Sequence, residues 1–153
     1  MVVPIAHERT SDMKASALDR EQRSFEAVPA SARAARRFVA DSLRAHGATA
    51  QVVNDYVLVA SELTSNIIEH GNGSSMEILI DASDPDWWDV EVVGVSSTTH
   101  EQLLRPETWT VAGTDEATGR GHGIVRHLMD EISCNANAGY FSVRCRRRRD
   151  QSV

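Results

Sequence analysis

This sequence has few cysteines, few aromatic residues and no long hydrophobic run. Only two of its 153 residues are cysteines, and aromatic residues make up 5%. Cys134 and Cys145 belong to no CxxC motif and have no histidine close by, so we expect a reduced structural pair and no zinc site. No apolar run approaches the ~20 residues of a membrane span, and the N-terminus lacks the pattern of a signal peptide. We therefore expect a cytoplasmic protein without membrane contact.

Basic charge is also scarce. The chain has 22 acidic and 16 basic side chains, and its formal net charge is −6. Domains that bind nucleic acid usually carry a clear basic excess, so direct contact with nucleic acid is not expected. The one basic run, Arg144 and residues 146–149, is interpreted as a solvated tail after the last strand. The length is that of one ordinary domain, which excludes a multidomain enzyme.

Periodic patterns divide the chain into a polar arm, one folded domain and a short tail. We expect a flexible arm over residues 1–23, a domain over 24–147 and a basic tail over 148–153. Within the domain the patterns predict an edge strand at 24–28, a helix between Ser31 and Gly47, a helix at about 50–70, a hairpin over 75–92, a long loop over 96–119, a helix from Ile124 to Ile132 and a final hairpin that includes Cys145. This order predicts an α+β two-layer sandwich, with a mixed, mostly antiparallel sheet and helices on one face.

The helix predicted at about 50–70 carries a polar stripe beside its apolar stripe. Glu62, Asn66 and His70 follow one another at intervals of four residues, and Asp55 falls on the same side. A carboxylate, an amide and an imidazole at the edge of a core can point into a cleft. The alternative is that they form the solvated flank of an amphipathic helix.

A glycine cluster separates the long loop from the next predicted helix. Gly119, Gly121 and Gly123 alternate with Arg120 and His122. Glycines just before a helix leave the backbone free to direct N–H groups at an anion. No Gly-Lys-Ser/Thr follows and no strand leads in, so the cluster is neither a P-loop nor a dinucleotide fingerprint. The alternative is a flexible end to the loop.

Two segments together resemble a known superfamily. Residues 62–71, Glu-Leu-Thr-Ser-Asn-Ile-Ile-Glu-His-Gly, resemble the N box of the Bergerat-fold ATPases, the superfamily of gyrase, Hsp90, histidine kinases and MutL. Residues 119–125, Gly-Arg-Gly-His-Gly-Ile-Val, resemble its second glycine box. The Ala-Arg-Arg-Phe-Val of the first helix and the short lid are similar to the anti-sigma factor and serine-protein kinase group. The likeness covers about residues 25–146 and implies the histidine kinase-like ATPase fold.

The resemblance implies an ATP-binding anti-sigma factor that is also a serine/threonine protein kinase. By similarity, Asn66 coordinates the Mg²⁺ that bridges the ATP phosphates, Glu62 is the general base, and His70 belongs to the nucleotide-binding box. The glycine box would line the triphosphate with Gly119, Arg120, Gly121, His122 and Gly123. The implied partners are a sigma factor, which is held inactive, and a STAS-type anti-anti-sigma protein, which is phosphorylated. A homodimer formed through the sheet near Phe25 is also implied.

One motif of this family is missing. The family has an Asp-x-Gly-x-Gly sequence at the end of the strand that here covers residues 89–95, and its aspartate accepts the adenine amino group. The matching position is Val93 or Gly94, and residues 96–99 supply hydroxyls but no carboxylate. Loss of a buried acceptor weakens recognition of a base edge. The alternative function is therefore that of a degenerate, non-catalytic member that binds a sigma factor or another regulator without using ATP.

Overall fold

The elements follow one another in the order that the periodic patterns predict. The computed structural model describes residues 19–70, 75–95, 117–137 and 139–150, without the side chains of residues 70 and 117–122. The elements are β1 (Arg20–Glu26), the short 3-10 helix η1 (Pro29–Ser31), α2 (Ala32–Ala45), α3 (Ala50–His70), β2 (Ser75–Asp81), β3 (Trp87–Val95), α4 (Ala117–Leu128), β4 (Glu131–Asn137) and β5 (Tyr140–Arg148). The loop predicted over 96–119 lies largely outside the described residues.

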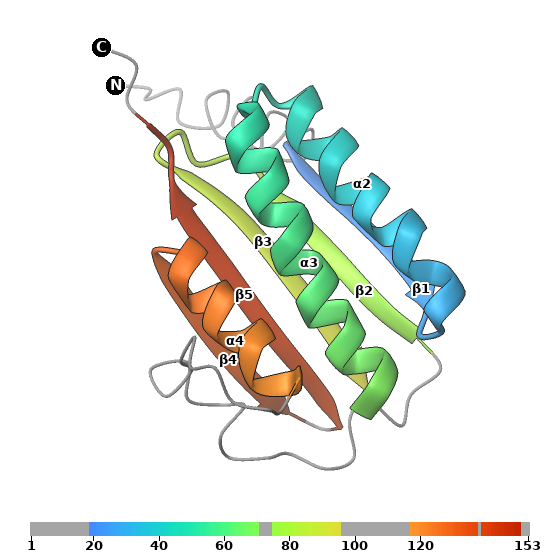
Figure 1. Cartoon of the computed structure of the whole chain (residues 1–153). Helices are drawn as coiled ribbons and strands as arrows, with labels where there is room; N and C mark the ends of the chain where they lie inside the picture. The colour runs from blue at the N-terminus through green and yellow to red at the C-terminus, as the bar shows by residue number, and fades with distance from the viewer. Residues whose placement is uncertain (1–18, 71–74, 96–116, 138, 151–153) are drawn as a thin grey trace, which may run out of the picture.

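The strands form one five-stranded sheet in the order β1-β2-β3-β5-β4. Every neighbouring pair of these described strands is antiparallel. The helices cover one face: α2 lies over β1 and β2, α3 crosses the middle of the sheet, and α4 lies over β4 and β5 (Figure 1). The predicted two-layer α+β sandwich with its helices on one face is confirmed.

The core lies between the helices and the sheet because apolar residues alternate along the strands. In β2, Met76, Ile78 and Ile80 are buried, and the residues between them are half-buried. In β3, the side chains of Trp88, Val90 and Val92 face the same layer. The helices complete the core with fully buried side chains that include Val39, Leu43, Tyr56 and Val59. Burial of this apolar surface stabilises the fold by roughly 25 cal/mol per Å².

The first strand begins earlier than its apolar content predicts. It starts at Arg20 rather than Ser24, and Arg20 lies opposite Asp81 of β2. The two side chains form an ion pair with an N–O distance of 2.9 Å. Phe25 alone is buried in β1, so the sequence of this edge strand shows little of the hydrophobic alternation that would reveal it.

The boundary between α4 and β4 was also predicted wrongly. Ile132 lies in β4, where it pairs with Cys145 of β5, and α4 ends at Leu128. The apolar residues of this segment fit a helical period across the boundary, so periodicity alone could not locate it. At the other end, α4 begins at Ala117, so residues 119–123 lie inside its first turns rather than ahead of the helix.

The first long helix ends where glycine predicts. Gly47 has a φ of 86°, in the left-handed region that glycine adopts without steric cost. Just before it, Nδ1 of His46 lies 2.8 Å from the carbonyl oxygen of Ser42. The imidazole thus caps a carbonyl of the last helical turn, and the chain can turn directly into α3.

Candidate functional site

The polar side of α3 faces α4 and the far end of the sheet. Asp55 forms an ion pair with Arg147 of β5, and its carboxylate is largely buried. Glu62 and Asn66 follow Asp55 after about two and three helical turns, so they lie on the same side of the helix. The helix α4 lies over β5 and packs against α3 (Figure 1). Both side chains are half-buried, so they sit at the edge of the core rather than on the open surface.

The predicted glycine box lies on the neighbouring helix. Residues 119–123 belong to α4, and Gly123 is buried. The side chains of Arg120, His122 and His70 fall outside the described residues, so their predicted roles stay predictions. The structure therefore brings together the two helices that carry the predicted site.

The missing aspartate corresponds to Gly94, and Ile67 takes up the space beside it. A Cβ at Gly94 would lie 2.8 Å from Cγ1 of Ile67 and 2.9 Å from its Cδ1 and Cγ2. Distances below 3.0 Å are closer than real side chains tolerate, so β3 can approach α3 here only because residue 94 has no side chain. Val93 points to the opposite face of the sheet, since successive strand residues alternate. Of the two positions that match the missing aspartate, only residue 94 could present a carboxylate to the side of the sheet that the helices cover.

The only aspartate of β3, Asp89, serves another purpose. Asp89 lies on the sheet face turned away from the helices and is only 7% exposed. The Nε of Arg144 lies 2.9 and 3.0 Å from its two carboxylate oxygens, and the Nε of Arg146 lies 3.5 Å from one of them. The hydrogen bond to Asp89 raises the pKa of Arg144. Asp89 is thus committed to an ion-pair network and cannot replace the missing acceptor.

The arginine run is not a solvated tail, contrary to the prediction. Arg144, Arg146, Arg147 and Arg148 lie within β5. Arg146 and Arg148 stack on the ring of Trp87, with 4.4 and 4.9 Å between guanidinium carbon and ring centroid. In the strand register, Arg146 lies opposite Asp89 and Arg144 lies opposite Glu91 of β3, which composition did not reveal.

A buried tyrosine was not singled out by sequence, although it joins three elements. The hydroxyl of Tyr56 on α3 lies 2.9 Å from the carbonyl oxygen of Trp88 and 3.1 Å from that of Cys145. Burial raises the pKa of this phenol. Tyr56 directly follows Asp55 in the chain, so it fixes α3 to β3 and β5 next to the ion pair of Asp55 with Arg147. Its apolar surroundings resemble an ordinary core position in sequence, so only the structure shows the hydrogen bonds.

The residues present suit part of the implied ligand. Among the described residues, no group of three or more His, Cys, Asp or Glu could hold a metal ion. A Mg²⁺ ion shared with phosphates needs only one or two protein oxygens, and the half-buried amide of Asn66 supplies that type of ligand. Asn66 therefore suits the phosphate end of ATP, whereas the described end of β3 offers no carboxylate to recognise adenine. None of the described helices is long and apolar enough to cross a membrane.

Comparison with known proteins places the chain in a family. Residues 25–146 match the histidine kinase-like ATPase domain, and the chain belongs to that family. Its structure is similar to that of the RsbU and RsbW domains of Rv1364c from Mycobacterium tuberculosis, with a TM-score of 0.59, 18% identity, and coverage of 84% of this chain and 32% of that one. It is also similar to the SiaB-SiaC complex from Pseudomonas aeruginosa, with a TM-score of 0.61, 16% identity, and coverage of 95% of this chain and 99% of that one.

These likenesses establish a shared fold. The chain spans about a third of the Rv1364c chain that it matches, with 32% of that chain covered. A search of curated protein sequences finds no significant match. Family membership and the placement of α3 beside α4 are therefore the two findings on which a function can be built.

Proposed function

We propose that this protein is an ATP-binding regulator of the anti-sigma factor type that phosphorylates a serine or threonine of a partner protein. The observation that supports this proposal is the packing of α3, which carries Glu62 and Asn66, against α4, whose first turns contain residues 119–123. Membership of the histidine kinase-like ATPase family supports ATP as the substrate. If Glu62 and Asn66 were only a solvated flank of α3, nothing would require α3 to pack against the helix that carries residues 119–123.

Each part of the site has a distinct task in the proposed reaction. The amide oxygen of Asn66 would hold Mg²⁺, which neutralises phosphate charge when it is bound. The carboxylate of Glu62 would accept the proton of the attacking serine or threonine hydroxyl. The hydroxyl oxygen would bond to the γ-phosphorus while the bond between the γ-phosphorus and the oxygen shared with the β-phosphate breaks, which releases ADP. Residues 119–123 would bind the phosphates near the start of α4, where the helix dipole favours negative charge.

The proposed partners are a sigma factor and a STAS-type anti-anti-sigma protein, bound in the cytoplasm. The solved complex of SiaB with SiaC shows that a protein of this fold forms a complex with a second protein.

The test is a phosphotransfer assay with the cognate partner, matched to a calorimetric titration of ATP with and without Mg²⁺. Glu62→Gln is expected to lower transfer by about 10²-fold or more while ATP still binds, because a general base contributes roughly that factor. Glu69→Gln, a change of the same kind on the exposed side of α3, is the control and should retain transfer. Equal activity of the two variants would show that Glu62 is not the base.

A second candidate function is favoured by the contact between Gly94 and Ile67. Since the position for an adenine-binding carboxylate has no side chain and Ile67 takes up the adjacent space, the protein could sequester its partner without using ATP. Partner affinity measured with and without ATP and Mg²⁺ distinguishes the two functions. Unchanged partner affinity and no heat of ATP binding would support sequestration alone.

A further inference from the structure

A second surface, away from the candidate nucleotide site, has the features of a binding groove. A groove of about 590 Å³ lies between β1 and α2, at the opposite edge of the sheet from α4. Arg23 of β1 and Arg33 and Arg37 of α2 line it together with Phe38. α2 runs along β1 in Figure 1, so these side chains follow the length of the strand.

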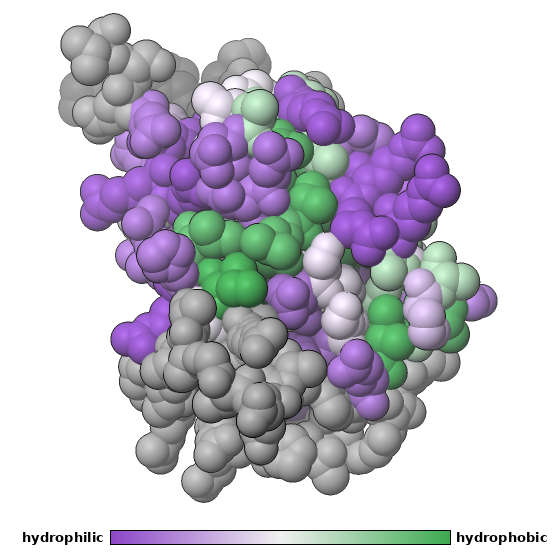
Figure 2. Space-filling model, viewed as in Figure 1, coloured by the Kyte–Doolittle hydropathy of each residue, from purple (hydrophilic) through white to green (hydrophobic). Residues whose placement is uncertain are grey.

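The groove carries more positive than negative charge, because three arginines and two carboxylates line it. Asp41 lies 3.6 Å from Arg44, which is outside the lining, and Glu21 accepts a hydrogen bond from the neutral Ser42 hydroxyl. Arg33 and Arg37 form no ion pair or hydrogen bond with any described residue and are exposed. Figure 2 shows mostly hydrophilic side chains along the upper part of α2, whereas hydrophobic ones gather over neighbouring parts of α3 and α4.

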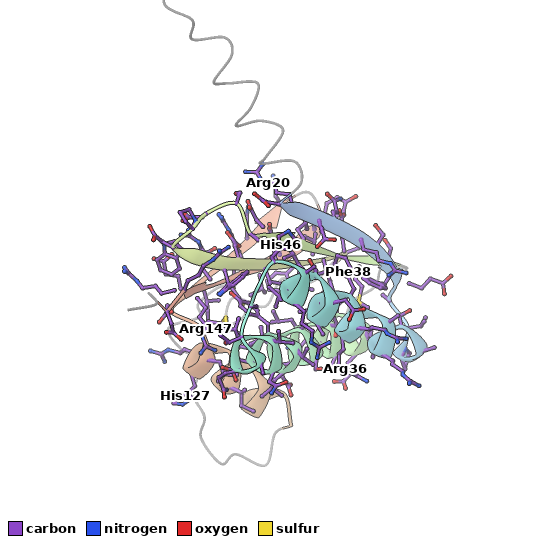
Figure 3. All side chains as sticks on the ribbon, turned by 90° about the horizontal axis from the view of Figure 1, so that it is seen from above. Arg20, Arg36, Phe38, His46, His127 and Arg147 are labelled. Atoms are coloured by element: carbon purple, nitrogen blue, oxygen red, sulfur yellow. The ribbon has the colours of Figure 1, made fainter. Side chains whose placement is uncertain are left out.

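The groove also offers an apolar wall and a free strand edge. Phe38 is half-buried and contacts Phe25, with 6.0 Å between the ring centroids. Figure 3 shows Phe38 on the side of α2 next to the sheet. Among the described strands β1 pairs only with β2, so the backbone groups of its other edge have no strand partner. Such an edge can accept an extended segment through main-chain hydrogen bonds.

We propose that this groove binds an extended acidic segment of a partner protein, which adds to the free edge of β1 as a further strand. Alternate side chains of a strand are about 7 Å apart, and Arg33 and Arg37 are one helical turn of about 5.4 Å apart. Every second residue of the bound segment would therefore bring a carboxylate to Arg23, Arg33 or Arg37. The residues between them would point to the other face of the sheet.

The resemblance implies a homodimer near Phe25 of β1, but a second copy of this chain is a poorer occupant of this groove than an acidic segment. Pairing two β1 strands around a two-fold axis would bring the arginines of both grooves toward one another. Of the two groove carboxylates, Asp41 already pairs with Arg44 of its own chain, which leaves Glu21 alone to oppose the arginines. The proposal does not depend on ATP use, so it stands or falls separately from the kinase assignment.

The test is fluorescence anisotropy of the full-length protein with a labelled peptide in which glutamate and valine alternate. We expect saturable binding that weakens as salt is added, because exposed charges are screened. Arg33→Glu with Arg37→Glu should weaken binding by at least about tenfold, or about 1.4 kcal/mol. Arg36→Glu is the control, since Arg36 lies on the same helix but does not line the groove (Figure 3), and it should change affinity by less than about threefold.

Two further peptides separate strand addition from simple charge attraction. A peptide with lysine in place of glutamate should not bind, and an acidic peptide with alternate backbone nitrogens methylated should lose at least about tenfold in affinity because it cannot complete the strand ladder. Undiminished binding of the methylated peptide would overturn the strand addition. Equal weakening by Arg36→Glu, or a protein dimer that the charge-reversed variant abolishes, would overturn the assignment of the groove to an acidic partner.

Discussion

The backbone of Gly94 packs directly against the side chain of Ile67, which would lie within 2.9 Å of any Cβ at that position. Ile67 directly follows Asn66, so the same turn of α3 carries the proposed Mg²⁺ ligand and the side chain that closes the strand end. A carboxylate at residue 94 would therefore require a smaller residue at position 67.

The first prediction concerns the fit of this pair. Gly94→Ala should destabilise the protein by about 1–3 kcal/mol, because the added methyl overpacks a buried contact. In an Ile67→Ala background the same substitution should cost at least about 1 kcal/mol less, because the clashing atoms are gone. Urea unfolding of the four proteins of this cycle measures the coupling. Additive costs would show that the two residues do not interact.

The same pair allows a test of base recognition. Gly94→Asp combined with Ile67→Ala should strengthen ATP binding relative to GTP, because the carboxylate can accept a hydrogen bond from the adenine amino group only when the space is open. Gly94→Asp alone should show no such gain. Competitive titration of ATP and GTP with each variant measures the ratio of the two affinities. An unchanged ratio in the double variant would show that residue 94 does not face the base.

The hydroxyl of Tyr56 should control stability in alkaline solution. Burial raises its pKa above the ordinary value of 10.0, so the unfolded chain loses this proton before the folded one. Stability from the neutral phenol is therefore fully present below about pH 10 and falls as pH rises further. Tyr56→Phe should cost about 1–3 kcal/mol near neutral pH through lost hydrogen bonds, yet show a smaller decline between about pH 9 and 11.

The control for this experiment is Tyr140→Phe, because Tyr140 is 58% exposed. Urea unfolding of both variants at neutral and alkaline pH provides the comparison. The prediction fails if Tyr56→Phe and wild type lose stability in parallel as pH rises.

The ion pair between Asp55 and Arg147 should matter more than a surface pair. Their side chains are 12% and 21% exposed, so loss of one charge leaves the other poorly solvated. Asp55→Asn should destabilise the protein by roughly 1–3 kcal/mol, below the range for fully buried pairs. Asp41→Asn removes the exposed pair with Arg44 and should cost less than about 1 kcal/mol. Thermal unfolding of both variants measures the difference, and equal costs would contradict it.

Burial should distinguish two leucines on adjacent helices. Leu43 of α2 is fully buried, whereas Leu58 of α3 is 41% exposed. Leu43→Ala should cost about 2–5 kcal/mol because it leaves a cavity between the helices and the sheet. Leu58→Ala should change the unfolding free energy by less than about 1 kcal/mol. A large loss in the second variant would show that Leu58 is buried by an assembly partner.

Much of the fold could be predicted because its elements have clear local periods. Alternation from Met76 to Ile80 predicts the apolar side of a strand, and helical spacing around Leu43 predicts the apolar side of a helix. The start of β1 at Arg20 escaped prediction because the strand is polar, and it is held in place by pairing with residues about sixty positions away, such as Asp81. Ile132 was assigned to a helix because a short apolar segment fits both periods.

Part of the candidate site could likewise be predicted from the sequence, and part could not. Helical spacing alone placed Glu62 and Asn66 on one side of α3. The direction in which that side faces follows from the contact of Asp55 with Arg147, a residue 92 positions along the chain. No local pattern contains that information, because it depends on which strand lies beneath the helix.

The sequence by itself determined the order of the elements, the side of each that is apolar, and the absence of an aspartate near the end of β3. Only the tertiary structure decided that residue 94, rather than Val93, faces the helices and that Ile67 takes up the space beside it. It also decided that the arginines of β5 are structural, while Arg33 and Arg37 of α2 form no ion pair with any described residue. The physical reason is that periodicity acts between neighbours in sequence, whereas close packing and ion pairing act between residues that only the fold brings together.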